Sequence, residues 1–292
     1  MDRISFIKSL GALGTLSLTN MTLIDLKKLS DHLPASDLMP VLFVGHGNPM
    51  NAIEDNEFSR GWQRASEGLK PAVILCVSAH WETHGSYVTG MDHPETIHDF
   101  GGFPQALFDT QYPAPGSPAM AKVIQDIVTT AHVGITQEWG LDHGTWSVLI
   151  KMFPNADVPV LQLSLDRSLS ADKMYALAQE LGVLRTKGVL IVGSGNIVHN
   201  LRLGKFGGSD PAPYDWAIEF DEQVAGLINE RNHASLVDYR NLGKAANLSI
   251  PTPEHYLPML YTLGLQRRDE HAHFFNESIA FGSGSMRSFI IA

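Results

Sequence analysis

The sequence has little of what several common types of site require. Cys76 is its only cysteine in 292 residues, which excludes an intramolecular disulfide and a zinc cluster built from thiolates. There is no basic excess, because 21 lysines and arginines stand against 31 aspartates and glutamates, for a net charge of -10. This balance argues against nucleic acid and anionic membrane as main partners. With 13 histidines, any metal site is expected to use imidazole and carboxylate ligands.

Long apolar runs are also missing. The N-terminal stretch MDRISFIKSLGALGTLSLTNM has basic residues and then a mildly apolar segment, which Thr and Asn interrupt. It resembles a twin-arginine export signal, but Ile4 stands where the second arginine belongs and no small-residue cleavage site follows. We therefore expect a cytoplasmic protein with an N-terminal extension over residues 1–38, and export is the alternative. Membrane association is not expected, since no later run approaches the length of a span.

From residue 39 onward, apolar runs alternate with helical patterns. Continuous apolar runs, typical of strands covered on both faces, occupy residues 41–44, 72–79, 158–165 and 188–195. Helical patterns occupy residues 116–132, 170–185 and 215–230, with a further helix near Pro253 and a hairpin around residues 282–285. This alternation, without repeats or a linker, predicts a single three-layer α/β/α domain over residues 39–292 with a mostly parallel or mixed central sheet.

Histidines follow three of these predicted strands. His46 and His80 come directly after the first two runs, and His199 comes a few residues after the fourth. Because open α/β sheets place their ligand sites at the carboxyl ends of strands, we expect these side chains at one edge of the sheet. His143 and His255 lie at expected helix starts, from which they can face the same edge. Glycines in GHG and DHG allow the backbone to approach a ligand closely.

Motifs of rival enzyme classes are incomplete or absent. Residues 193–198 begin like a dinucleotide-binding fingerprint, but Val198 occupies the position of the third glycine. The sequence has no Gly-x-Ser-x-Gly nucleophile elbow, no His-Glu-x-x-His zinc protease motif and no Walker sequence. The histidines at the strand ends therefore remain the candidate site.

Seven short motifs occur in order along the chain. They are GHGNPM, SAHWET, IHDFGGFP, YPAPG, GLDHGTW, GSGNIVHNL and HYLPML. Together they resemble the class III extradiol ring-cleavage dioxygenases, in the 4,5-DOPA dioxygenase branch, over roughly residues 39–292. The resemblance implies a single-domain α/β/α fold that binds one non-haem Fe(II) ion. It also implies a DOPA-like catechol and O2 as substrates.

The same resemblance implies a set of metal ligands. His46 and His80 match the two histidines of the first motifs, and the late motif offers His255 as the third ligand. Glu254 stands beside it, and a related branch uses glutamate, so a carboxylate ligand stays open at this point. His199 is implied as the acid/base histidine, and as a fourth ligand when Zn(II) occupies the site, because zinc favours four-coordinate geometry.

Further residues are implied around the substrate. His143 matches a second histidine that contacts the substrate or bound oxygen. His98, in IHDFGGFP, is expected to approach the substrate, with a structural role in the loop as the alternative. Trp81 and Phe103 are candidates for lining the ring pocket, with ordinary packing as the alternative. Residues 85–115, rich in Gly, Pro, Asp and aromatics, are expected to form a long functional loop.

The implied reaction explains these residue types. A metal held by few protein ligands leaves positions for both catechol oxygens and for O2, and a histidine can take and return the phenolic proton. The ring then opens next to the diol and gives a muconic semialdehyde. One alternative is a zinc hydrolase that activates water with the same histidines. Another is a non-catalytic metal-binding protein, which would not need His143 and His199 beyond three ligands.

Overall fold

The structure is a computed structural model that describes residues 36–207 and 211–292. Almost all of the expected extension lies outside the described residues, so its boundary at residue 38 stays a prediction. One eight-stranded sheet has the order β4-β3-β5-β2-β6-β1-β10-β7. Its strands are β1 (Val41–Gly45), β2 (Val73–Thr83), β3 (Ser86–Thr89), β4 (Val133–Thr136), β5 (Val160–Asp166), β6 (Val189–Gly195), β7 (Ala272–Phe275) and β10 (Ser288–Ile291).

The sheet is mixed. Its centre, β5-β2-β6-β1, is parallel, whereas β10 pairs antiparallel with both β1 and β7. At the other end β3 is antiparallel to β5 and parallel to β4. Because the four central strands run in one direction, their carboxyl ends meet at one edge of the sheet.

Helices cover both faces of the sheet. They are α3 (Glu57–Ser66), α4 (Gln105–Phe108), α5 (Pro118–Ile127), α6 (His143–Met152), α7 (Ala171–Leu181), α8 (Asp215–Asn229), α9 (His233–Val237), α10 (Lys244–Ser249) and α11 (Leu257–Gly264). Short 3-10 turns are η1 (Pro49–Ala52), η2 (Gly182–Lys187), η3 (Leu201–Leu203) and η4 (Tyr239–Asn241). A small hairpin joins β8 (Ile279–Ala280) and β9 (Gly284–Ser285), as expected for this segment.

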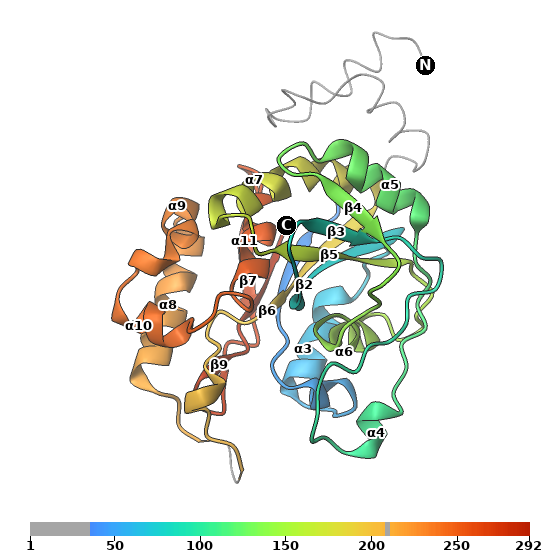
Figure 1. Cartoon of the computed structure of the whole chain (residues 1–292). Helices are drawn as coiled ribbons and strands as arrows, with labels where there is room; N and C mark the ends of the chain where they lie inside the picture. Colours follow the sequence, from blue (N-terminus) through green and yellow to red (C-terminus); the bar gives the residue numbers. More distant parts are fainter. Residues whose placement is uncertain (1–35, 208–210) are drawn as a thin grey trace.

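Alternate residues of β1 point into two separate cores. Val41 and Phe43 pack with residues of α5, α7, α8 and α11 on one face. Leu42 and Val44 pack on the other face with Trp62 of α3 and residues of α6. All four of these strand residues are fully buried, which is why the run reads as continuously apolar. Figure 1 shows α3 and α6 together on one side of the strands and α7 and α11 on the other, which confirms the three-layer α/β/α prediction.

Some predicted boundaries differ from the observed ones. The helix expected over residues 116–132 ends at Ile127, because Val128 is extended and leads into β4. The expected loop over residues 85–115 contains β3 and α4. The late helix begins at Leu257, and a turn precedes it.

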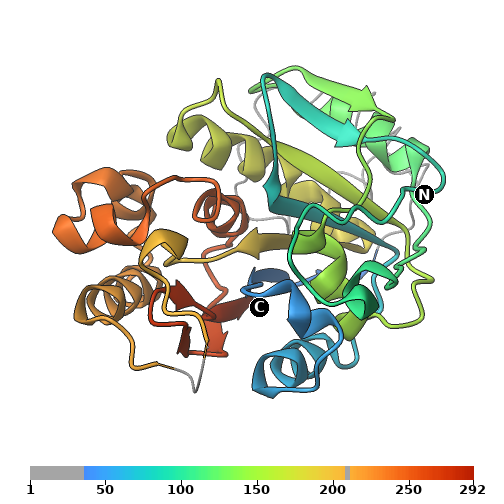
Figure 2. The ribbon, with the colours of Figure 1, turned by 60° about the horizontal axis from the view of Figure 1, so that its bottom comes forward.

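Figure 2 shows the segment of α8, α9 and α10 lying beside the sheet and apart from α3. None of the helices in the described ranges combines the length and apolarity needed to cross a membrane.

Candidate metal centre

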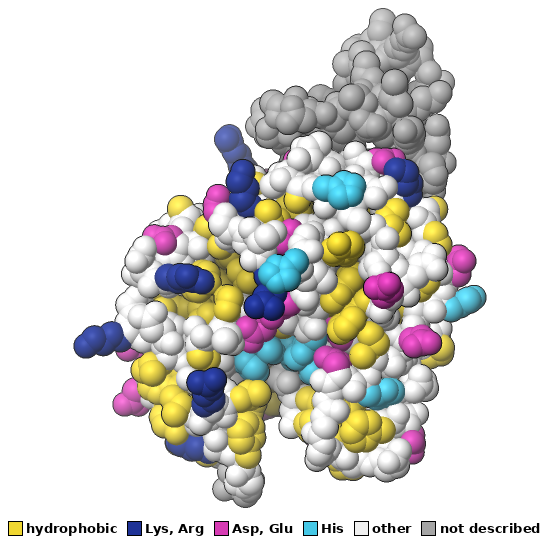
Figure 3. Space-filling model, in the orientation of Figure 1, with side chains coloured by type: hydrophobic (Ala, Val, Ile, Leu, Met, Phe, Trp, Pro, Cys, Tyr) yellow, Lys and Arg dark blue, Asp and Glu magenta, His cyan; other side chains and the backbone are white. Residues whose placement is uncertain are grey.

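Three imidazoles come together at the carboxyl edge of the sheet. His46 follows β1, His80 lies near the end of β2, and His255 lies in the turn before α11. The Nε2 atoms of His46 and His80 are 3.1 Å apart, and one nitrogen from each of the three residues lies within 4.8 Å of the others. Two nitrogens bound at about 2.1 Å to one ion lie roughly 3.0 to 3.4 Å apart. Figure 3 shows histidine side chains gathered in a hollow of the surface.

The turn that carries His255 lies directly against the end of β6. The backbone N–H of Asn196 donates to the carbonyl oxygen of His255 at 2.8 Å. A Cβ atom added to Gly195 would lie 2.1 Å from that same oxygen, so only glycine allows this approach. The glycine of the sequence motif therefore positions the third imidazole beside the first two.

Ser194 determines which nitrogen of His46 faces the centre. The buried Ser194 hydroxyl donates to the carbonyl oxygen of Gly144 and lies 3.0 Å from Nδ1 of His46. Because a hydroxyl has one proton, the N–H on Nδ1 must donate to Ser194. The lone pair on Nε2 of His46 is then free to bind a metal. The sequence analysis missed Ser194, because a small residue between two glycines resembles part of a turn.

Asp99 lies between His80 and His143. Its Oδ2 is 3.4 Å from Nδ1 of His80, and its Oδ1 is 3.0 Å from Nδ1 of His143. The backbone N–H of His143 donates to the same Oδ1 at 2.8 Å. Burial would raise the pKa of Asp99, but hydrogen bonding and charge interaction with His143 outweigh burial and lower it. Asp99 was not expected as a site residue, although it stands next to His98 in the IHDFGGFP motif.

The carboxylate of Asp99 also orients His80. A proton on Nδ1 of His80 faces Asp99, so Nε2 of His80 carries a lone pair, as Nε2 of His46 does. Two lone pairs 3.1 Å apart repel each other unless a cation lies between them. The donor set therefore fits a bound divalent metal.

Glu254 is placed behind His255. Its Oε1 lies 3.0 Å from Nδ1 of His255 and accepts a hydrogen bond from Thr252 at 2.9 Å. A carboxylate that holds the remote nitrogen of a ligand histidine is the usual outer partner in metal sites. Glu254 also groups with His199 and His255 within 4.8 Å. The contact with Nδ1 favours His255, with its free Nε2, as the third ligand.

Two more histidines flank the three. The His143 ring centroid is 3.8 Å from that of His80, and the His199 ring is stacked on His255. His143 is the first residue of α6, whose N-cap is the buried Asp142. Asp142 accepts hydrogen bonds from Ser78 at 2.7 Å and from Gln162 at 2.6 Å, which fixes the start of the helix.

Burial favours the neutral form of His46, His80, His199 and His255. Burial, with repulsion from neighbouring histidines, lowers the pKa values of His46 and His255 well below the ordinary value. Burial is also the main cause that lowers the pKa of His80 to about 3 and that of His199 to about 4. Neutral imidazole is the form that binds metal, so the cluster is ready to bind at neutral pH.

The remaining expected residues lie outside this cluster. Nε2 of His98 is 2.9 Å from the carbonyl oxygen of Thr110, and its ring lies against Trp146. Trp81, which is 4% exposed, stacks on Trp139 with planes 3° apart.

Phe103 contacts Phe100 at a centroid distance of 5.4 Å. Phe100, which the sequence analysis did not single out, lies 5.5 Å from the ring of His143. These contacts favour packing roles for His98, Trp81 and Phe103, and direct substrate contact by them stays a prediction. Phe100 belongs to the expected loop over residues 85–115, and its ring lies against His143 of the cluster.

Comparisons with known proteins show the family to which this chain belongs. The family described as the catalytic LigB subunit of aromatic ring-opening dioxygenase matches residues 40–283. The chain is 48% identical over 265 residues to a 4,5-DOPA dioxygenase extradiol of Escherichia coli K12, covering 89% of this chain and 97% of the relative. A Beta vulgaris protein of the same name is 35% identical over 249 residues, covering 83% and 92%. The crystal structure of an uncharacterized Escherichia coli K12 protein matches with a TM-score of 0.76 and 43% identity, covering 87% of this chain and 100% of that one.

The matched region contains the entire histidine cluster. It runs from residue 40, just before β1, to residue 283, beyond the turn that carries His255. The resemblance expected from the seven motifs is confirmed. The expectation of an oxidoreductase that acts on a small aromatic molecule with O2 is confirmed as well. This chain belongs to the LigB family of aromatic ring-opening dioxygenases and is an extradiol ring-cleaving enzyme.

Proposed function

We propose that this enzyme uses one Fe(II) ion and O2 to open the ring of a DOPA-like catechol, giving a muconic semialdehyde. The observation that carries the proposal is the convergence of His46, His80 and His255, with His143 and His199 beside them. The relatives named 4,5-DOPA dioxygenase extradiol support the substrate class. Extradiol cleavage needs a metal with few protein ligands and separate groups that move protons, and this donor set supplies both.

In this proposal His46, His80 and His255 hold the metal. When bound, Fe(II) would supply coordination positions for both catechol oxygens and for O2, and it would mediate electron transfer from the catechol to O2. Ser194, Asp99 and the Glu254 carboxylate hold the outer nitrogens of these ligands, so that Nε2 of each ring stays directed inward. The protein therefore orients three neutral ligands, and the two carboxylates contact only their outer nitrogens.

The two flanking histidines move protons. With a pKa lowered to about 4 by burial, His199 is neutral at pH 7 and can accept a proton from a catechol hydroxyl. The imidazolium that forms in this way can return the proton at a later step. His143 faces Asp99 with Nδ1, which leaves Nε2 for the substrate side. The Phe100 ring beside His143 offers an apolar wall for the catechol ring.

Metal reconstitution with defined substrates tests this function. Metal-free protein is loaded anaerobically with Fe(II) or with Zn(II), and oxygen uptake is then followed with a panel of catechols. We expect the Fe(II) form alone to consume O2, form a yellow product and incorporate both atoms of labelled O2. A catechol methylated on one hydroxyl should be inert, because it cannot bind through two phenolic oxygens. Hydrolysis of esters by the Zn(II) form, with no oxygen uptake by the Fe(II) form, would instead support the hydrolase alternative.

A further inference from the structure

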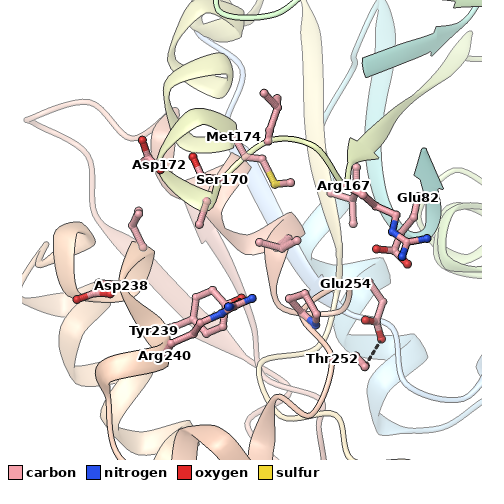
Figure 4. Close-up of a pocket in the computed structure, with 16 residues that line it drawn as sticks. Glu82, Arg167, Ser170, Asp172, Met174, Asp238, Tyr239, Arg240, Thr252 and Glu254 are labelled. Carbon is pink, nitrogen blue, oxygen red and sulfur yellow. Dashed lines mark hydrogen bonds between the residues drawn. The ribbon is translucent and has the colours of Figure 1, made fainter. Parts of the chain in front are cut away.

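A cavity of about 760 Å³ opens next to the candidate metal centre. It lies among the ends of β2 and β5, the beginning of α7, the segment around η4 and the turn before α11 (Figure 4). Glu254 is part of its lining, and its Oε1 is 3.0 Å from Nδ1 of His255. One side chain therefore separates this cavity from a proposed metal ligand.

The strands give a second connection between the cavity and the histidines. Glu82 lines the cavity and follows His80 by two residues on β2. Arg167 follows the neighbouring strand β5, and its backbone N–H donates to the carbonyl oxygen of Thr83 at 2.8 Å. The edge of the sheet that carries the metal centre thus continues directly into this cavity.

Glu82 and Arg167 place opposite charges on one wall. Figure 4 shows their side chains next to each other, above Glu254. Within residues 36–207 and 211–292, neither the carboxylate of Glu82 nor the guanidinium of Arg167 has a hydrogen bond or ion pair with another side chain. Glu254 differs, because its carboxylate already contacts Thr252 and His255. One positive and one negative group on this wall therefore have unused capacity to bind a ligand.

We propose that this cavity binds the zwitterionic tail of the catechol substrate, with Arg167 binding its carboxylate and Glu82 its ammonium group. This inference rests on the proposed function and assigns the residues that would recognise the tail of its substrate. A tail with only a carboxylate would meet the negative charges of Glu82 and Glu254. A tail with only an ammonium group would meet Arg167. A zwitterion matches both signs, and the planar guanidinium fits a carboxylate through two parallel hydrogen bonds.

The opposite wall offers a matched control. Arg240 also lines the cavity, but its Nε lies 3.4 Å from the Tyr239 hydroxyl and its guanidinium lies 5.8 Å from the centre of that ring. Figure 4 shows Arg240 beside Tyr239, across the cavity from Arg167. The substitution Arg240→Gln removes the same charge from the same cavity without touching the proposed tail site.

Four catechols that differ only in the tail test the proposal. L-DOPA has both charged groups, 3,4-dihydroxyphenylpropionate has only the carboxylate, dopamine has only the ammonium group, and 4-methylcatechol has neither. The measured quantity is kcat/KM of the Fe(II) enzyme for each, divided by its kcat/KM for 4-methylcatechol. We expect Arg167→Gln to lower this ratio roughly five- to fiftyfold for L-DOPA and dihydroxyphenylpropionate but not for dopamine. Glu82→Gln should lower it for L-DOPA and dopamine but not for dihydroxyphenylpropionate.

The outcomes separate this inference from the proposed function. If the wild-type Fe(II) enzyme cleaves none of the four catechols, the proposed function fails. If it cleaves them and Arg167→Gln leaves all ratios within twofold of wild type, only the tail site is overturned. An equal loss in Arg240→Gln would move the carboxylate to the other wall and overturn the assignment to Arg167. A loss that is the same for all four substrates would overturn tail recognition, because it would show a general disturbance of the metal centre.

Discussion

The imidazole of His199 lies flat against that of His255, with ring centroids 3.4 Å apart and planes 14° apart. The three histidines whose nitrogens converge are His46, His80 and His255, whereas His199 groups with His255 and Glu254. His199 therefore lies beside a proposed ligand without belonging to the converging three. In the proposed mechanism, different histidines therefore hold the metal and move the proton.

The first prediction concerns that separation. His199→Ala should retain most Fe(II) and still bind catechol, because the three proposed ligands are intact. Its kcat should fall roughly a hundred- to ten-thousandfold, the usual effect of removing a general acid/base. Iron content of the purified variant and the absorbance of the yellow product are measured on the same sample. Loss of iron together with activity would instead make His199 a ligand, and unchanged activity would leave His143 as the candidate.

The second prediction concerns the ligand set. His46→Ala, His80→Ala and His255→Ala should each lose most of the bound metal, measured as metal content after dialysis. Glu254→Gln should bind metal only about 10- to 100-fold more weakly, because it removes the partner of His255 Nδ1 and not a ligand. Full occupancy in His255→Ala, with loss in Glu254→Gln, would show that the carboxylate is the third ligand.

The third prediction concerns Asp99. In Asp99→Asn, the amide keeps the size of the side chain, but its single acceptor oxygen cannot replace both carboxylate oxygens, which face Nδ1 of His80 and Nδ1 of His143. We expect kcat/KM to fall roughly 10- to 100-fold at saturating Fe(II), with a shifted pH profile. Asp92→Asn, an exposed carboxylate of the same loop, is the matched control. Similar activities for the two variants would remove Asp99 from the site.

The fourth prediction concerns stability against pH in the metal-free protein. Burial lowers the pKa values of His80 and His199 to about 3 and about 4, whereas an unfolded histidine titrates near 6.5. Between these values the unfolded chain binds more protons than the folded chain. The free energy of unfolding should therefore be highest above about pH 6.5 and decrease as the pH falls towards 4, by about 1.4 kcal/mol per pH unit for each such histidine.

Urea unfolding between pH 7.5 and 5 measures this slope. His199→Asn should reduce the slope of the unfolding free energy against pH by the contribution of close to one proton. His84→Asn, which replaces an exposed histidine, should leave it unchanged. Identical slopes in all three proteins would show that His199 is not held neutral by the fold.

Much of the histidine cluster could be predicted from the sequence, because apolar runs mark the ends of buried strands. His46 and His80 follow such runs directly, and parallel strands must end at one edge. Asp99 and Ser194 could not be found in this way. Asp99 lies in an irregular loop whose sequence has no periodic pattern. Ser194 lies beside His46 only because β6 pairs with β1. The sequence also does not favour His255 over Glu254 as the proposed third ligand, because adjacent residues look equally suitable in a motif, whereas the contact between their side chains does.

The fold was predictable for the same reason and to the same extent. β1, β5 and β6 are buried along their whole length, and β2 is buried as far as Ala79, so these strands are mostly apolar in sequence. β3 and β4, at one end of the sheet, have the sequences SYVT and VGIT. Each is short and contains an exposed residue, so its sequence does not differ from that of a loop. β3 is placed by its pairing with β5, and β4 is placed by its pairing with β3, and local sequence does not report either pairing.

The sheet also has a consequence for the growing chain. Among the described residues β1 is the earliest strand, yet its two neighbours are β6 and β10, which come much later in the sequence. During synthesis its apolar residues must wait for these later partners, a situation that favours binding by chaperones. The proposed ligands follow the same schedule, since His46 and His80 emerge long before His255. In the proposed site, the metal can therefore be held by all three ligands only after His255 has been synthesised.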